Sequence, residues 1–308
     1  MAILFLRRRK LGLGSLRGMV AYLNELDNPR ALPSRGYNGE EASFVLNEDY
    51  NPQNYNPDED LLIRWGCTSN VNWTLRNTLN PSPAIHYMSN KLQQRMDMQD
   101  AGVSVPQTVT SIAHLPRMNY PVVIRPRTHA QGRNLYVANS STEAINIIGR
   151  QKSLFDGWYA SEYIPKTNEY RVYIVHNRVV MMAEKIPENV RDIAWNHALG
   201  STFQNVRWGD WNLEVIRTAL HGFRILEENG ADFTGIDVMY NNNDGRAYII
   251  EANSAPSLPL NNDGSASYRQ RCMAKVFRYY NETREKFPRI NRVNEWRDAI
   301  HPGVNDND

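Results

Sequence analysis

Two short apolar segments joined by an Asn- and Gly-rich turn constrain the fold of this 308-residue chain more than any other feature. The segments FTGIDVMY (residues 233–240) and AYIIEAN (residues 247–253) have the composition of β-strands, and NNNDGR between them is typical of a hairpin turn. Because side chains alternate across a strand, Glu251 and Asn253 point to the same face. The hairpin therefore brings an acid and an amide together at the end of an apolar strand.

The length of the turn decides whether Asp237 faces Glu251. If the loop has three residues, Asn242 pairs with Arg246, and Asp237 lies directly opposite Glu251. A two-residue Asp-Gly turn instead places Asp237 opposite Ala252, on the other face, unless a β-bulge restores the register. The sequence is compatible with both registers.

Facing carboxylates are destabilising unless a positive charge lies between them. Asp237, Glu251 and Asn253 offer two carboxylates and an amide oxygen, which are hard ligands that suit Mg²⁺ together with phosphate oxygens. This pattern predicts a magnesium site that holds a nucleotide. The alternative is an acid and an amide that cap a helix or stabilise a turn before Pro256, and these residues alone favour neither interpretation.

The composition is that of an ordinary globular protein, with 41% hydrophobic and 22% charged residues. A chain of this length can bury a sizeable core and is expected to form two or three lobes. The 35 basic and 33 acidic residues give a net charge of +2, so no overall excess indicates a nucleic-acid partner. Cys67 and Cys272 lie far apart, which argues against disulfides or a Cys-based metal site and favours a reducing, cytoplasmic location.

The N-terminus, MAILFLRRRK, has an apolar run followed by basic residues. A signal peptide has the opposite order, and a membrane span needs about 20 apolar residues, so we expect neither a leader nor a membrane partner. Residues 3–6 are predicted to form the first strand of a core sheet. Residues 7–10 are interpreted as a solvated strand end rather than a nucleic-acid-binding arm, because no basic or aromatic stripe continues them.

The remaining patterns indicate three lobes of an α+β protein with antiparallel sheets. The first lobe contains a strand at residues 61–65, after a loop rich in Asn, Pro and Asp. The second contains a helix from residue 89 that stops at Gly102, followed by two strands around the polar turn RTHAQGRN, which form a flap. The third lobe contains a hairpin with HN at its tip, a helix within residues 210–232, the acidic hairpin and a closing helix after Pro259.

Five of these segments resemble, in order, pieces of the ATP-grasp family. GIDV with IIEANSAPSLP resembles the family's metal-binding end, and SNKLQQRMDMQDAGVSVPQT resembles its lysine-bearing helix. YPVVIRPRTHAQGRNLYV resembles the phosphate flap, and ASEYIPKTNEYRVYIVHNRVV the adenine-binding hinge and next hairpin. The resemblance covers residues 85–260. It implies two α+β lobes that clamp ATP (residues 85–157 and 158–308) and an N-terminal α/β lobe (residues 1–84).

The resemblance also implies roles for individual residues. Lys91 and Arg125 would contact ATP phosphates, although many members have Lys at the second position. In the flap, Gly132 would let backbone amides approach the phosphates, with His129 and Arg133 beside it, although this loop has fewer glycines than is usual. His129 could equally be an exposed loop residue.

At the hinge, the resemblance implies that Glu162 receives the adenine amino group while the backbone of Tyr163 and Ile164 reads the purine edge. Glu169 would contact either the ribose or the metal shell, and Lys185 would be either a phosphate contact or an exposed strand end. Arg171 would face the reacting centre, and Asn196 would lie beside the acyl acceptor; with Lys185 they are the catalytic candidates. Asp237, Glu251 and Asn253 would hold two Mg²⁺ ions on ATP, with Mn²⁺ able to substitute.

The activity implied by the resemblance is an ADP-forming carboxylate–amine ligase of RimK-like type that works through an acyl phosphate. Its substrates would be amino acids, peptides or proteins, selected by the first lobe and by residues 188–210. The Trp and Arg side chains of that segment would bind a peptide or simply pack the lobe: Arg191, Trp195, Arg207, Trp208 and Trp211. A small-molecule kinase, a non-catalytic nucleotide-binding protein and a structural component remain alternatives, and the oligomeric state stays open.

Overall fold

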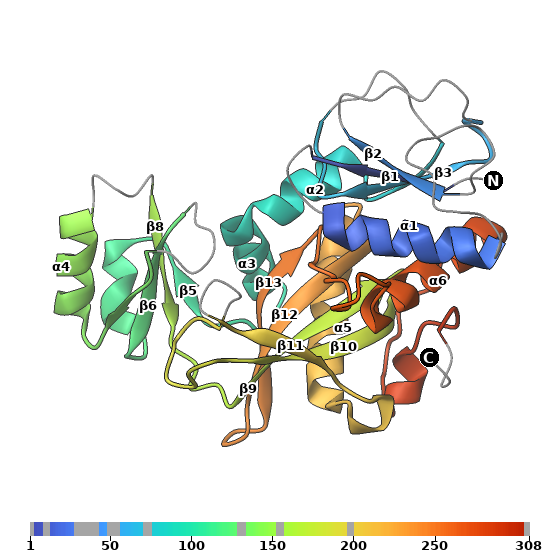
Figure 1. Cartoon of the computed structure of the whole chain (residues 1–308). Helices are drawn as coiled ribbons and strands as arrows, with labels where there is room; N and C mark the ends of the chain where they lie inside the picture. Colours follow the sequence, from blue (N-terminus) through green and yellow to red (C-terminus); the bar gives the residue numbers. More distant parts are fainter. Residues whose placement is uncertain are drawn as a thin grey trace.

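The computed structural model describes residues 3–8, 13–27, 43–47, 56–69, 76–127, 134–151, 157–195 and 200–304. Within these ranges the chain forms three β-sheets, one after another along the sequence (Figure 1). No helix in the described ranges is long and apolar enough to cross a membrane. The predicted domain limits at residues 84 and 157 remain predictions, and helix α2 (Ser82–Ser89) spans the first of them.

The N-terminal sheet has the strand order β2-β1-β3-β4, and every pairing in it is parallel. Its strands are β1 (Ile3–Arg7), β2 (Ser43–Asn47), β3 (Leu61–Trp65) and β4 (Asn77–Leu79). The strands predicted at residues 3–6 and 61–65 are confirmed, but the expectation of antiparallel pairing is wrong for this sheet. Parallel pairing needs long crossover connections, and helix α1 (Leu13–Asp27), which the sequence analysis missed, lies in the first of them.

The second sheet is antiparallel, with the order β5-β8-β6-β7. Its strands are β5 (Thr108–Val109), β6 (Val122–Pro126), β7 (Tyr136–Ala138) and β8 (Trp158–Glu162), and helix α4 (Ser141–Gln151) flanks it (Figure 1). Helix α3 (Lys91–Asp100) precedes this sheet and begins at Asn90, whose side chain accepts a hydrogen bond from the Gln93 amide. The tip of the predicted flap, residues 128–133, lies outside the described residues.

The third sheet carries the acidic hairpin and has the order β11-β10-β9-β12-β13, all antiparallel. Its strands are β9 (Asn168–Val175), β10 (Arg178–Ile186), β11 (Thr202–Asn205), β12 (Phe233–Asn241) and β13 (Arg246–Asn253). The predicted HN turn between β9 and β10 is present, because His176 and Asn177 have φ of 45° and 64°. Such a pair of positive φ angles is typical of a two-residue hairpin.

Two helices cover opposite faces of the third sheet. Val172 and Ile174 of β9 belong to the same core as helix α5 (Leu213–Glu228), while Tyr173 and Val175 belong to the core of helix α6 (Tyr268–Thr283). The α6 core also includes the N-terminal sheet, because Trp65 stacks on Phe233 at 5.4 Å between ring centroids. The face of β9 that is apolar at Tyr173 and Val175 carries Arg171 and Glu169 further toward its N-terminal end.

Candidate active site

In the acidic hairpin Asp237 pairs with Glu251, as one of the two predicted registers requires, but the loop is longer and the strand pairing contains a β-bulge. Asn241 pairs with Arg246, so the loop has four residues rather than three, and this register alone would place Asp237 opposite Ile250. A β-bulge between Asp237 and Val238 shifts the register by one residue and brings Asp237 opposite Glu251. Asp237 and Glu251 therefore share a face, as the first of the two registers predicted, but the loop has neither of the two predicted lengths.

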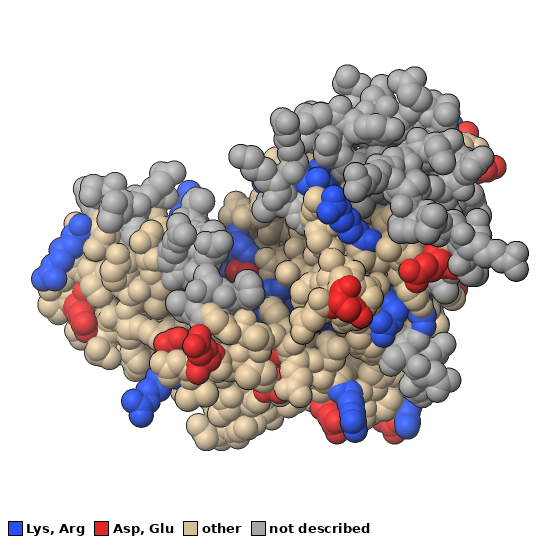
Figure 2. All heavy atoms as spheres, in the orientation of Figure 1, with Lys and Arg blue, Asp and Glu red and all other residues tan. Residues whose placement is uncertain are grey.

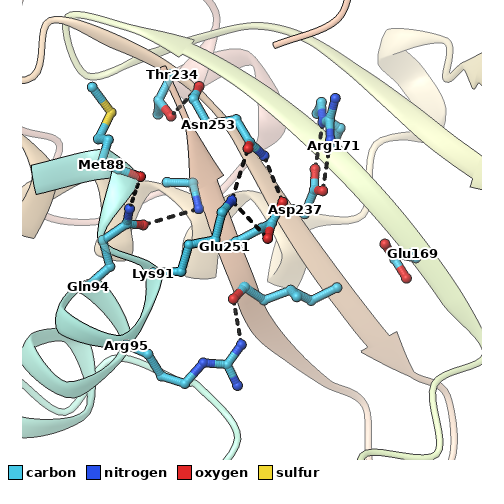
Figure 3. Close-up of polar contacts among 12 residues, drawn as sticks. Met88, Lys91, Gln94, Arg95, Glu169, Arg171, Thr234, Asp237, Glu251 and Asn253 are labelled. Atoms are coloured by element: carbon cyan, nitrogen blue, oxygen red, sulfur yellow. Dashed lines mark hydrogen bonds and ion pairs between the residues drawn. The ribbon is translucent and has the colours of Figure 1, made fainter. Parts of the chain in front are cut away.

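Helix α3 holds the bulge in place. The Arg95 Nη2 atom donates a hydrogen bond of 2.5 Å to the Ile250 carbonyl, and the Gln94 side chain accepts one of 3.2 Å from the Ala252 amide (Figure 3). These bonds satisfy backbone groups on both sides of Glu251, so α3 fixes where the Glu251 carboxylate lies. Neither side chain was among the predicted site residues.

Each carboxylate of the hairpin has a basic partner. Arg171, the cross-strand neighbour of Asp237 on β9, donates from Nε and Nη2 to the two Asp237 oxygens at 2.5 and 2.8 Å. The Lys91 Nζ atom lies 2.8 Å from Glu251 Oε2 and donates to Asn253 Oδ1 at 3.1 Å. Figure 3 shows these side chains converging from α3, β9, β12 and β13.

A second group of charges lies next to this row on β9 and β10. Glu169 accepts hydrogen bonds from both Lys166 and Lys185, and Lys185 Nζ also lies 3.4 Å from Asp237 Oδ2. Lys185 is only 6% exposed. The alternative that Lys185 is merely an exposed strand end is therefore wrong.

Each charged side chain of the site stabilises the ionised form of its partner. Burial opposes ionisation of Asp237, but Arg171 and Lys185 outweigh it and hold the pKa of Asp237 well below its usual range. The pKa of Glu251 is also lowered, because Lys91 outweighs both burial and the repulsion from Asp237. Burial likewise works against a charged Lys185, yet Asp237 and Glu169 raise its pKa. Both hairpin carboxylates are thus ionised at neutral pH.

This donor set fits Mg²⁺ only in combination with other oxygens. Within the described ranges, no three His, Cys, Asp or Glu side chains form a cluster that could hold a metal ion. Asp237 and Glu251 are two ionised carboxylates on one face, and Asn253 next to them donates from Nδ2 to Glu251 while its Oδ1 accepts from Lys91. Mg²⁺ commonly takes one or two carboxylates, keeps water and draws its remaining ligands from phosphate, so the residues fit a metal that arrives with a nucleotide.

The site opens into a cleft of about 820 Å³ between the second and third sheets. All of the predicted site residues that the structure describes line it: Lys91, Arg125, Glu162, Tyr163, Ile164, Glu169, Arg171, Lys185, Asp237, Glu251 and Asn253. Figure 2 shows basic and acidic side chains within the hollow. A smaller cavity of about 260 Å³, beside His176 at the β9–β10 turn, contains none of them.

The hinge end of the cleft is formed by the segment after β8. The Tyr163 backbone N–H donates to the Pro121 carbonyl at 3.0 Å, so this N–H is already bonded within the protein. Arg125 lies on β6 and lines the same cleft. Four predicted residues lie outside the described residues: His129, Gly132, Arg133 and Asn196.

The Trp side chains in and next to residues 188–210 were predicted either to bind a peptide or to pack the lobe, and the structure separates them into two groups. Trp195 lines the cleft, and Lys166 Nζ lies 4.3 Å from the centroid of its ring. Trp208 and Trp211 pack on each other and on Trp296, with centroid separations of 5.9 to 6.2 Å. The latter pair therefore packs the lobe, while Arg191 and Arg207 are exposed.

The cleft is strongly cationic, although the chain as a whole is almost neutral. Among the described residues that line it, seven side chains are basic and four are acidic, a local excess of three positive charges. Three of the basic side chains were not among the predicted site residues: Arg95, Lys166 and Arg269. A cleft of this charge attracts polyanions and orients their charged groups.

No family model matches the sequence, and no curated protein is significantly similar to it. Solved structures do match its fold. The ATP-grasp ligase PsnB in complex with minimal precursor, Mg and ADP has a TM-score of 0.61 at 12% identity, over 91% of this chain and 97% of PsnB. D-cycloserine synthetase DcsG has a TM-score of 0.60 at 12% identity, over 91% of this chain and 100% of DcsG.

The macrocyclase MdnC, bound with precursor peptide MdnA from Microcystis aeruginosa MRC, has a TM-score of 0.57 at 13% identity, over 91% of this chain and 100% of MdnC. The chain has the ATP-grasp fold. This confirms the predicted fold class. At 11–13% identity the similarity establishes the fold alone.

Proposed function

We propose that this protein is an ADP-forming carboxylate–amine ligase of RimK-like type. The observation that carries the proposal is the row Glu251, Asp237 and Arg171, which three adjacent strands place side by side in a cationic cleft. The two ionised carboxylates would bind the metal ions of an anionic nucleotide, and the guanidinium next to them would bind an anionic substrate or the group transferred to it. Ligases of the same fold have been solved in complex with Mg and ADP or with ATP, which supports this chemistry for the row.

ATP would lie between the hinge and the row of Glu251, Asp237 and Arg171. The adenine would contact Glu162 and the backbone of Tyr163 and Ile164, and Glu169 would contact the ribose or the metal shell. Lys91 and Arg125, from α3 and β6, would bind the phosphates together with the flap residues His129, Gly132 and Arg133. The local excess of positive charge in the cleft supports this placement.

Asp237, Glu251 and Asn253 would hold Mg²⁺, two ions in the fully loaded site, and Mn²⁺ would substitute. The metal would offset the repulsion between the γ-phosphate and an incoming carboxylate. Lys91 and Arg171 now neutralise Glu251 and Asp237, and they would turn toward phosphate and substrate oxygens on loading. The basic partners therefore keep the carboxylates ionised until the nucleotide arrives.

The proposed reaction has two steps. A substrate carboxylate oxygen attacks the γ-phosphorus of ATP, the bond to the β,γ-bridging oxygen breaks, and ADP and an acyl phosphate form. An amine then attacks the acyl carbon, loses a proton to solvent or a nearby base, and releases inorganic phosphate as the amide forms. Arg171 and Lys185 would stabilise charge on the transferred group, and Asn196 would lie beside the acceptor.

The substrates would be amino acids, peptides or proteins. PsnB and MdnC were solved with precursors or precursor peptides, and Trp195 offers this chain an aromatic surface within the cleft. We assign the protein to the cytoplasm because Cys67 and Cys272 are both free and buried, as is usual in a reducing compartment.

The proposal is tested by ADP release from Mg-ATP with pooled amino acids and short peptides, followed by mass spectrometry of the products. We expect ADP formation to require both a carboxylate and an amine, and a new amide mass to appear. A stable phosphorylated product without dependence on an amine would establish a kinase instead. ATP binding without any ADP would establish a non-catalytic nucleotide-binding protein.

A further inference from the structure

The ring of Phe203 lies among three cations of the cleft, and the proposed reaction gives this ring no role. Its centroid lies 4.8 Å from the Arg171 Cζ atom, 5.6 Å from the Lys185 Nζ atom and 5.6 Å from the Arg269 Cζ atom. Phe203 is half-buried, lines the cleft and was not among the predicted site residues. The face of an aromatic ring attracts cations because its π-electrons carry partial negative charge, and the attraction is strongest where water is excluded.

The pairing of the strands explains why the ring lies there. Phe203 on β11 is the cross-strand partner of Lys185 on β10, so both side chains leave the sheet on the same face. Arg171 on β9 pairs with Ala183 of β10, two residues before Lys185 and therefore on that face too. Because Ala183 carries only a methyl group, it leaves room for the Phe203 ring to reach the Arg171 guanidinium across β10.

Packing is the simplest role for such a ring, since Phe203 contacts the α6 core. An aliphatic side chain would pack there equally well. It would, however, remove water from the neighbouring cations without any attraction in return, whereas an aromatic ring replaces part of the lost solvation. The residue type at position 203 is therefore matched to its cationic neighbours.

Arg171 is held from two sides, and one of the two contacts is lost in the proposed reaction. Its Nε and Nη2 atoms donate to the two Asp237 oxygens, which would bind the metal. The contact with the Phe203 ring does not depend on Asp237, because β11 and β12 lie on opposite sides of β9 in the sheet. The ring can therefore keep the guanidinium in place after Asp237 has exchanged partners.

We propose that Phe203 is a positioning residue for Arg171. Its ring holds the guanidinium beside Asp237 and Glu251 when the oxygens of these carboxylates bind the metal. Arg171 then faces the transferred phosphoryl group from a fixed position, with Lys185, the cross-strand partner of Phe203, next to it. This inference rests on the proposed ligase function, because it assigns a supporting residue to the same reaction.

The first test is Phe203→Leu, which keeps an apolar side chain but removes the π-electrons. With Mg-ATP, hydroxylamine and the amino acid or peptide that reacts fastest, kcat for hydroxamate formation should fall by about 10- to 30-fold, and the KM for ATP should stay within about twofold. Phe203→Tyr restores an aromatic ring and should bring kcat to within about threefold of the native value. Equal losses of kcat in the two variants would overturn the proposal, and so would a loss that appears only in the KM for ATP.

The matched control is Phe287→Leu. The Phe287 ring is also half-buried and lies 5.2 Å from the Arg178 Cζ atom, but it lines the smaller cavity outside the cleft. This variant removes a similar contact between a ring and an arginine from a place that the reaction does not use, so kcat and the KM for ATP should match the native values. A loss of kcat as large as that of Phe203→Leu would mean that such rings act through the fold, and would overturn the proposal.

A readout in the ligand-free protein separates this proposal from the ligase proposal. If the native protein forms no hydroxamate, the ligase function fails, and urea denaturation of Arg171→Met, Phe203→Leu and the double variant then tests the contact alone. We expect the double variant to lose less stability than the sum of the two single losses, because each single change already removes the shared contact. Additive losses would show that Phe203 does not hold Arg171, and would overturn the proposal.

Discussion

The two ends of the cleft treat buried charge in opposite ways. In the middle, Asp237 and Glu251 are each matched by a basic side chain, and the pairs come from adjacent strands or from α3. At the α6 end, Arg269 is 8% exposed, and its Nε and Nη1 atoms have no hydrogen-bond partner among the described residues. Arg269 contacts the Tyr173 hydroxyl and the Phe203 ring, and no ion pair with an acid is found for it among the described residues. Buried charge is therefore balanced by opposite charge in the middle of the cleft, and by a hydroxyl and an aromatic ring at the α6 end.

The largest effect is expected from the middle of the cleft. Glu251→Gln keeps the shape of the side chain but removes one ionised ligand of the proposed metal site, so ADP formation should fall by about 10³-fold. The melting temperature should change little. Glu282→Gln, on the exposed side of α6, is the matched control and should retain full activity. A folded Glu251→Gln protein with native turnover would remove the metal site from the account.

The next effect concerns stability in the absence of ligand. Arg171→Met removes the bidentate partner of Asp237 and leaves only Lys185, at 3.4 Å, to neutralise that buried carboxylate. The free energy of unfolding should fall by about 3 kcal/mol. Urea denaturation at pH 7 measures this change, and a loss below about 0.5 kcal/mol would show that the pair does not stabilise the fold.

His301 is a buried basic group that, unlike Arg269, can lose its proton and so remain neutral in the folded protein. Burial, helped by His176 and Arg178, lowers the pKa of His301 from 6.5 to about 3. The unfolded state thus takes up a proton below pH 6.5 that the folded state refuses, and stability is lost as the pH falls from 6.5 toward 3. Between pH 7 and 5 the native protein should lose up to about 2 kcal/mol more stability than His301→Gln. Equal losses in urea denaturation would contradict the shift.

The smallest effect is a change in stability at Arg269, which we expect to be opposite in sign to the change at Arg171. Arg269→Met removes a buried cation without breaking an ion pair, so the ligand-free protein should become more stable, by about 1 kcal/mol. The two arginine variants would then change the urea midpoint in opposite directions. A destabilisation of Arg269→Met as large as that of Arg171→Met would mean that Arg269 already has an anionic partner in the free protein.

Local patterns in the sequence were enough to predict most of the site. The hairpin, the face shared by Asp237 and Glu251, and the HN turn all depend on residues close together in the chain. The correct pairing nevertheless came from a wrong loop length, because the longer loop and the bulge at Ile250 offset each other. The bulge is held by Arg95, which is 155 positions away in the chain, and no local pattern reveals such a contact.

The remaining features of the site could not be predicted because they too depend on contacts between residues far apart in the chain. Burial of Lys185 depends on β11 and Glu169 packing around it, so its residue type alone left two interpretations open. Arg269 lies in a helix of ordinary composition, and its exposure to the cleft follows from how α6 meets the third sheet. The parallel N-terminal sheet escaped prediction because its pairing is set by long crossover connections rather than by short turns.

The central claim, that the row of Glu251, Asp237 and Arg171 activates a carboxylate with ATP, is tested most directly by trapping the intermediate. The protein is incubated with Mg-ATP, pooled amino acids and short peptides, and hydroxylamine, and hydroxamates and ADP are measured together. We expect one hydroxamate for each ADP, and the loss of both in Glu251→Gln. ADP release with a stable phosphorylated product and no hydroxamate would contradict it.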